Sequence, residues 1–179
     1  IGDGAMGFWS ALDEVYPDTR QQRCWMHKTM NVLNCLPKLS QPKAKQALHA
    51  IWQAETKADA QTAFDLFIDT YEAKYLKATT CLQQDREELM AFYDFPAQHW
   101  QSIRTSNPIE STFGTIRHRT KRSKGCLTRD GMLHMMFKLG MCAEKNWRRL
   151  RGFNYLAKVI AGIQFKDGIE VAEVNQVAA

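Results

Sequence analysis

Residues 104–129 read RTSNPIESTFGTIRHRTKRSKGCLTR and join a single acid to a dense basic run. Asn107 is a good N-cap and Pro108 is favoured at the first helical position, so we predict a helix that starts at Pro108. The residues at helical spacing that we expect to face a core are Ile109, Phe113 and Ile116. Glu110 therefore lies in the first turn of a helix that becomes cationic along its length.

The positive charge of the chain is concentrated in this segment. Seven Lys and Arg residues face one acid, Glu110, so the segment carries more positive charge than the formal +5 of the whole chain. Such clustering predicts a phosphate-binding surface, with a solvated face or loop as the alternative. The predicted DNA-binding residues are Arg104, Arg117, Arg119, Lys121, Arg122, Lys124 and Arg129.

Glu110 has two interpretations. Asn107-x-x-Glu110 fits a capping box, in which the Glu side chain bonds back to the amide of the cap residue. A carboxylate beside a polyanion-binding surface is instead suited to acid chemistry. Spacing alone favours the structural role.

The N-terminal residues offer a second acid. Asp3-Gly4 is turn chemistry, so we predict that residues 1–4 end a strand and that a helix follows over 5–16. Open α/β sheets place ligand-binding groups at the carboxyl ends of their strands, which makes Asp3 a candidate site residue. An Asx-turn or a helix cap is the alternative, and for Asp3 taken alone it is the better one.

Residues 20–27, RQQRCWMH, are predicted to form a short buried strand. Cys24 and His27 invite a zinc interpretation, but a strand would direct them to opposite faces and no second Cys/His pair follows at ligand spacing. We therefore expect Cys24 to be a small core residue and His27 a polar group near the site or in a structural contact.

The rest of the chain is predicted to be helical. From residue 31 to 95 the apolar residues recur at helical spacing, and a long helix is expected over 128–150. The expected helices of the first block are 43–54, 57–75 and 76–92, with a further helix at 159–165 and a loosely ordered tail at 166–179. The predicted domains are a strand–helix–strand part of the core (1–29), an all-helical insertion (30–103), C-terminal helices of the core with the second acid (104–165) and the tail.

Composition restricts the setting. The chain of 179 residues is 45% hydrophobic, and it contains neither an apolar run of membrane-spanning length nor a signal peptide, so no membrane partner is expected. Its five cysteines form no disulfide framework, which favours a reducing, cytoplasmic location. It begins abruptly at Ile1, which suggests that an upstream part precedes it.

An acid after a strand, a helical block and an acid on a helix together predict an interrupted α/β fold in which Asp3 and Glu110 meet. Two carboxylates in one cleft repel each other unless a cation lies between them. A hard cation such as Mg²⁺ (or Mn²⁺) prefers oxygen ligands and supports phosphodiester transfer.

The motifs together resemble the Mutator-type bacterial insertion-sequence transposases. The matching stretches are DGAMGFW at 3–9, QRCWMHK at 22–28, RTSNPIESTF at 104–113, RTKR at 119–122 and KGCL at 124–127. The resemblance implies an RNase H-like fold with a helical insertion, whose DDE triad binds two metal ions. Asp3 matches the second Asp of that triad and Glu110 the Glu, while Cys24 and His27 match a supportive C-x-x-H motif. The family usually has Thr at the position of Ser106.

The resemblance also implies a function. Such a protein cuts and joins DNA at transposon terminal inverted repeats and target sites, as a homo-oligomer on the bacterial nucleoid. The first triad Asp would lie upstream of Ile1, so this chain alone is predicted to be inactive. A non-catalytic nucleic-acid-binding remnant is one alternative, and a helical interaction protein is another.

Overall fold

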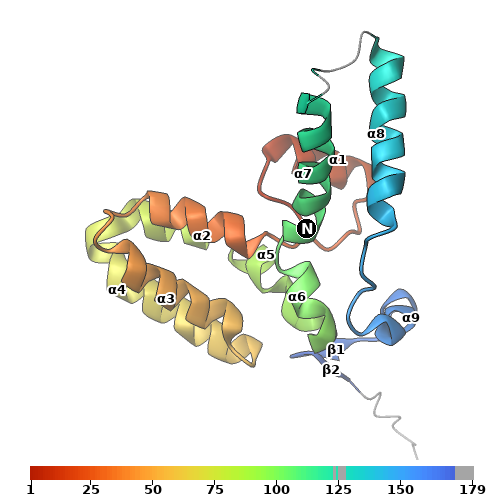
Figure 1. Cartoon of the computed structure of the whole chain (residues 1–179). Coiled ribbons are helices and arrows are strands. Elements are labelled where there is room, and N and C mark those ends of the chain that lie inside the picture. Colours follow the sequence, from red (N-terminus) through yellow and green to blue (C-terminus); the bar gives the residue numbers. More distant parts are fainter. Residues whose placement is uncertain (123, 125–127, 172–179) are drawn as a thin grey trace, which may run out of the picture. The chain divides into compact units, whose positions relative to one another are not determined.

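The computed structural model describes residues 1–122, 124 and 128–171, and these are predominantly helical (Figure 1). The longer helices are α1 (Met6–Val15), α2 (Trp25–Asn34), α3 (Gln41–Gln53), α4 (Lys57–Gln83), α7 (Asn107–Arg122) and α8 (Arg129–Glu144). The shorter helices are α5 (Arg86–Met90), α6 (Trp100–Ile103) and α9 (Leu156–Ile160), with 3₁₀ turns at Ala91–Asp94, Ala97–His99 and Phe153–Tyr155. The helical character is as predicted, whereas the RNase H-like core stays a prediction.

Contacts divide the chain into two compact units. The first comprises residues 1–105 and 151–179, and the second comprises residues 106–150. The assignment of these segments to a catalytic core and an insertion stays a prediction. None of the described helices is both long and apolar enough to cross a bilayer.

The core of the first unit lies among α2, α3 and α4, the helices drawn in orange and yellow in Figure 1. Pro42 occupies the first turn of α3, and Thr56 caps α4 by accepting a hydrogen bond from the Asp59 amide at 3.1 Å. The largest fully buried side chains include Trp25, Leu48, Ile51, Phe64, Phe67, Leu89, Phe92 and Tyr93. Their spacing gives each helix one buried stripe.

The predicted break between two helices at residues 75 and 76 is present as a kink. Tyr75 has non-helical backbone angles (φ −135°, ψ 51°) inside α4, and the helix continues beyond it to Gln83. A separate short helix, α5, then follows at Arg86–Met90. The kink and the α4–α5 turn fold the chain back toward α2, which matters for the polar network described below.

The strand predicted at residues 20–27 is wrong. Only an isolated parallel bridge joins Gly2 to Arg23, and α2 begins at Trp25. The buried residues of α2 are Trp25, Lys28, Thr29 and Val32, which is helical spacing. The strand interpretation failed because the segment was cut at His27, before this period became visible.

The apolar face predicted for the helix that starts at Pro108 is not buried in the described residues. Helices α1, α7 and α8 contain no buried residue, and Phe113 on α7 is 54% exposed. Within the second unit α7 has α8 as its helical neighbour, so a two-helix pair leaves much of each apolar face uncovered (Figure 1). On α8, Met132 and Met136 are each 40% exposed.

The C-terminal predictions also need correction. The helix expected at 159–165 is α9 at Leu156–Ile160, and α8 ends at Glu144 rather than near Leu150. Residues predicted as tail form a hairpin, in which β1 (Phe165–Lys166) pairs antiparallel with β2 (Ile169–Glu170). Asp167 and Gly168 both have positive φ, as a tight two-residue turn requires. The tail residues 172–179 lie outside the described residues.

Candidate active site and nucleic-acid interface

Asp3 lies in an exposed turn just before α1. Its Oδ1 accepts a hydrogen bond from the Ala5 amide at 3.1 Å, which is the Asx-turn expected from the sequence. The residue before it, Gly2, ties the backbone to the segment before α2: the Gly2 amide donates to Gln22 O at 3.0 Å, and the Cys24 amide donates to Gly2 O at 2.9 Å. Asp3 is therefore an exposed carboxylate next to a fixed backbone position.

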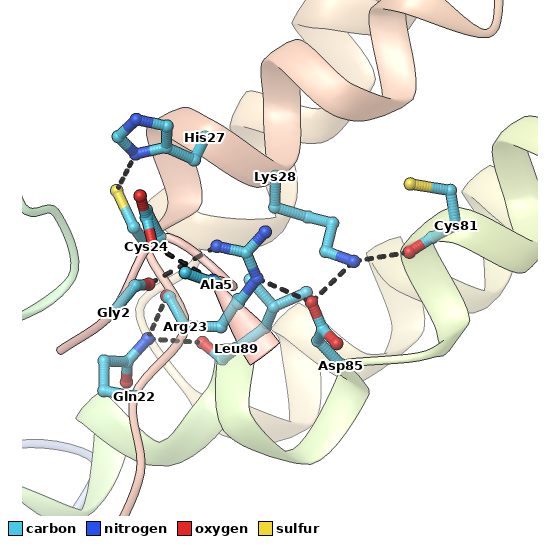
Figure 2. A network of polar contacts seen from close by, with 11 residues as sticks. Gly2, Ala5, Gln22, Arg23, Cys24, His27, Lys28, Cys81, Asp85 and Leu89 are labelled. Carbon is cyan, nitrogen blue, oxygen red and sulfur yellow. Dashed lines mark hydrogen bonds and ion pairs between the residues drawn. The ribbon is translucent and has the colours of Figure 1, made fainter. Parts of the chain in front are cut away.

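A buried polar network lies behind this turn (Figure 2). Asp85 Oδ2 is 2.7 Å from Arg23 Nε and 2.6 Å from Lys28 Nζ. The side chains of Arg23 and Lys28 are only 5% and 4% exposed, and that of Asp85 is 28% exposed. Lys28 Nζ also donates to Cys81 O at 2.6 Å. One carboxylate from the α4–α5 turn thus pairs with two buried cations from the start of α2.

Cys24 and His27 are close together, contrary to the strand-based expectation. Cys24 is the N-cap residue of α2 and is fully buried, as predicted for a core residue. His27 lies one turn later, with Nδ1 3.2 Å from Cys24 Sγ. The helix brings the two side chains to one side, which the assumed strand would not have done. Their supportive role stays a prediction.

Glu110 is exposed in the first turn of α7. The Ser106 hydroxyl donates to Glu110 Oε1, and the Glu110 amide donates to Ser106 O at 3.0 Å. The Glu110 side chain therefore accepts a hydrogen bond from the Ser106 hydroxyl at the helix start. The capping-box contact with the Asn107 amide stays a prediction. Glu110 belongs to the second compact unit and Asp3 to the first.

Most of the predicted DNA-binding residues are exposed within the second unit. The exposed members are Arg117, Arg119, Lys121, Arg122, Lys124 and Arg129, from the end of α7, the segment after it and the start of α8. Because a phosphate backbone is bound chiefly through Lys and Arg, these side chains are placed on a surface that a polyanion could reach.

Arg104 differs from the other basic residues because it is partly buried in the first unit. Its guanidinium carbon lies 4.6 Å from the centroid of the Trp52 ring, and its Nη1 donates to Trp52 O at 2.9 Å. Burial lowers the pKa of Arg104 from its ordinary value, while the nearby Tyr93 opposes the shift. The structure thus gives Arg104 a packing role, and its contact with DNA stays a prediction.

The donors that the sequence offers to a metal ion are the carboxylates of Asp3 and Glu110. Carboxylate oxygens match the preference of Mg²⁺ and Mn²⁺, so their chemistry fits the cation expected. In the described part of the chain, no three His, Cys, Asp or Glu side chains gather in a way that could hold a metal ion. That Asp3 and Glu110 bind a metal ion stays a prediction.

Neither Asp85 nor the roles of Arg23 and Lys28 could be predicted from the sequence. Asp85 lies 62 residues from Arg23, in a turn that carries no recognisable motif. The only available signal was the occurrence of Arg23 and Lys28 inside a stretch noted for its family resemblance. Their pairing with a distant acid could not be read from that stretch.

Comparison with known proteins gives one family. The family model described as "Transposase, Mutator family" matches residues 1–149. The transposase for insertion sequence element IST2 of Acidithiobacillus ferrooxidans is 56% identical over 169 residues, covering 94% of this chain and 57% of that protein. The transposase for insertion sequence element IS6120 of Mycolicibacterium smegmatis is 46% identical over 168 residues, covering 94% and 52%. The chain spans about half the length of these curated relatives.

Proposed function

We propose that this chain, which belongs to the Mutator family of transposases, supplies two catalytic carboxylates to a protein that cuts and joins DNA strands at transposon ends. The two residues are Asp3 and Glu110. The observation that carries the proposal is the exposed Glu110 at the start of α7, a helix whose last turn is exposed and basic and is followed by the exposed Lys124. An acid for the chemistry and a surface for phosphates thus occur on one element.

In this proposal the two carboxylates hold Mg²⁺ or Mn²⁺ within an RNase H-like core. Bound ions of this kind activate a water or a 3′-hydroxyl and stabilise the leaving oxygen in phosphodiester transfer. Ser106 orients Glu110 through its hydroxyl, and the turn before α1 orients Asp3 through the Ala5 amide. The basic residues of α7 and α8 bind the phosphates of transposon-end and target DNA.

The rest of the machinery is assigned to the longer protein. A first triad acid and the recognition of terminal inverted repeats would come from outside this chain, which alone would not cleave DNA. The complete protein would act as a homo-oligomer on the nucleoid in the bacterial cytoplasm. Cys24 and His27, held within 3.2 Å of each other, would support the local structure rather than react.

The test uses a chimera in which this chain replaces the matching 169-residue segment of the IST2 transposase. Cleavage and strand joining are measured on IST2 end DNA with Mg²⁺ and with Mn²⁺, and DNA binding is measured in parallel. Asp3→Asn and Glu110→Gln are each expected to abolish cleavage and joining while leaving DNA binding within about twofold. Cleavage by either variant at the unmutated rate would refute the proposal.

The second candidate function is a nucleic-acid-binding remnant without catalysis. The exposed basic residues of α7 and α8 favour it equally well, because they require no metal. It predicts salt-dependent DNA binding by this chain and a chimera that neither cleaves DNA nor changes its binding when Mg²⁺ is removed.

A further inference from the structure

The α4–α5 turn contributes one carboxylate to two nearly buried cations, Arg23 and Lys28. Buried cations need a partner because water no longer stabilises their charge. Asp85 faces both of them through the same oxygen, Oδ2, and Lys28 gains a second acceptor in Cys81 O (Figure 2). Asp85 is thus the anionic group that fixes the Arg23 guanidinium.

The Arg23 side chain also contacts the backbone turn that contains Asp3. Its Nη1 donates to Gly2 O at 3.4 Å, a long hydrogen bond, while its guanidinium covers Gly4 closely. A Cβ at Gly4 would lie 2.3 Å from Arg23 Nη2, and Gly4 has a φ of +96°, so this position requires glycine on both counts. The residues on either side of Asp3 therefore both contact the Arg23 side chain.

We propose that Asp85 is a positioning residue for Asp3, acting through the Arg23 guanidinium. The proposal rests on the proposed function, because it assigns to the helical segment α4–α5 the task of fixing one of the two catalytic carboxylates. Outer groups that orient a ligating carboxylate govern metal affinity almost as strongly as the ligands themselves.

Other contacts keep α5 in place without Asp85. The Arg23 amide donates to Glu88 O at 3.0 Å, the Trp25 ring Nε1 donates to Leu89 O at 2.8 Å, and Gln22 Nε2 donates to the same carbonyl at 3.3 Å. Asp85→Asn removes the negative charge but leaves these three contacts. Its effect is therefore expected at the Arg23 side chain and the turn that it covers.

The first measurement is backbone amide exchange by NMR in the ¹⁵N-labelled 179-residue chain. The amides of Gly2 and Cys24 report on the segment around Asp3, and those of Leu48 and Phe64 report on the core. We expect Asp85→Asn to speed exchange at Gly2 and Cys24 by about tenfold or more, with the core amides changed far less. Asp65→Asn is the matched control, because Asp65 makes an exposed ion pair with Arg86 in the same segment.

Arg23→Lys is the second variant and decides the matter if Asp85→Asn fails to fold. It keeps a cation beside Asp85 but loses the planar fork that reaches Gly2 O and covers Gly4. We expect the same selective loss of protection at Gly2 and Cys24. Unchanged exchange at these two amides in every variant that folds would overturn the proposal, as would an increase that is equal at the core amides.

The second measurement is the Mg²⁺ dependence of cleavage by the IST2 chimera. Asp85→Asn and Arg23→Lys are expected to raise the Mg²⁺ concentration for half-maximal cleavage by about tenfold, with DNA affinity unchanged. If Asp3→Asn retains cleavage while amide exchange at Gly2 rises in Asp85→Asn, the proposed function is refuted. The dependence of the turn around Asp3 on Asp85 is then still supported. If Asp3→Asn abolishes cleavage but neither exchange nor Mg²⁺ dependence responds to Asp85, the positioning role alone fails.

Discussion

The hydroxyl of Ser106 donates a hydrogen bond to the carboxylate of Glu110, one turn further along the chain at the start of α7. Ser106 is 7% exposed, whereas Glu110 is exposed. A fixed donor therefore holds an acceptor that solvent can reach. This arrangement restricts the Glu110 rotamer and leaves the carboxylate accessible from outside.

Removal of the Ser106 hydroxyl is expected to release Glu110. We predict that Ser106→Ala lowers cleavage by the IST2 chimera about tenfold, because the carboxylate proposed as a metal ligand loses a hydrogen bond that orients it. Ser106→Thr keeps a hydroxyl at the same position and should stay within about twofold of the unmutated rate.

The matched control for this prediction is Ser111→Ala, the same change at an exposed position on α7. It should leave the cleavage rate unchanged. Equal losses in Ser106→Ala and Ser111→Ala would indicate a general effect on the helix, and full activity of Ser106→Ala would contradict an orienting role for the hydroxyl.

Local signals in the sequence were sufficient for the starts of α4 and α8. Thr56 and Thr128 both cap a helix with their side chains, and the break near Tyr75 was visible in the apolar periodicity. The strand prediction for residues 20–27 was wrong because the extended bridge at Arg23 passes directly into a helix at Trp25. A window of eight residues holds too little of each pattern to separate them.

The candidate site was only partly accessible from the sequence. Asp3, Glu110 and the basic residues of α7 belong to short motifs that the family resemblance marks as candidates, although spacing alone favours structural roles for the two acids. Asp85 does not, because its partner Arg23 lies 62 residues away and the contact depends on how α4 and α5 fold back. Long-range pairing of this kind is set by packing and leaves no local signature.

The stability of the chain should depend strongly on Asp85. We predict that Asp85→Ala lowers the free energy of unfolding by about 3–5 kcal/mol, because it leaves two buried cations without their carboxylate. Asp65→Ala breaks only an exposed ion pair with Arg86 and should cost less than about 1 kcal/mol. Urea unfolding followed by circular dichroism measures both, and equal losses would contradict the assigned burial.

Tyr93 is expected to make stability pH-dependent in alkaline solution. Its hydroxyl donates to Ala54 O at 2.9 Å and to Ile51 O at 3.3 Å, and burial raises its pKa well above the ordinary value of about 10. The unfolded chain therefore releases this proton first as the pH rises. The stabilisation is complete below about pH 10 and is lost progressively above it.

The test of this prediction is a comparison with Tyr93→Phe. At pH 8 the variant should be less stable by about 1–3 kcal/mol, because two buried carbonyls lose their donor. Between pH 9 and pH 11 the difference in unfolding free energy between the two proteins should shrink, since the variant has no phenol to ionise. A difference that stays constant across this range would contradict the raised pKa.

DNA binding by the basic surface of the second unit should follow the salt dependence of phosphate contacts. We predict that Arg119→Gln and Lys121→Gln each reduce the slope of log affinity against log salt concentration by about 1, for binding of this chain to duplex DNA. Affinity should fall similarly on unrelated sequences, because phosphate contacts carry no base information. Fluorescence anisotropy at several salt concentrations measures both.

Two further variants test whether this effect belongs to the surface. Lys45→Gln, at an exposed position on α3, should leave the slope unchanged. Arg104→Gln differs from the surface variants because it should lower the melting temperature of the chain. The Arg104 guanidinium packs on Trp52 and donates to its carbonyl. If Lys45→Gln reduced the slope as much as Arg119→Gln, binding would follow net charge alone, and the α7 surface would have no special part in it.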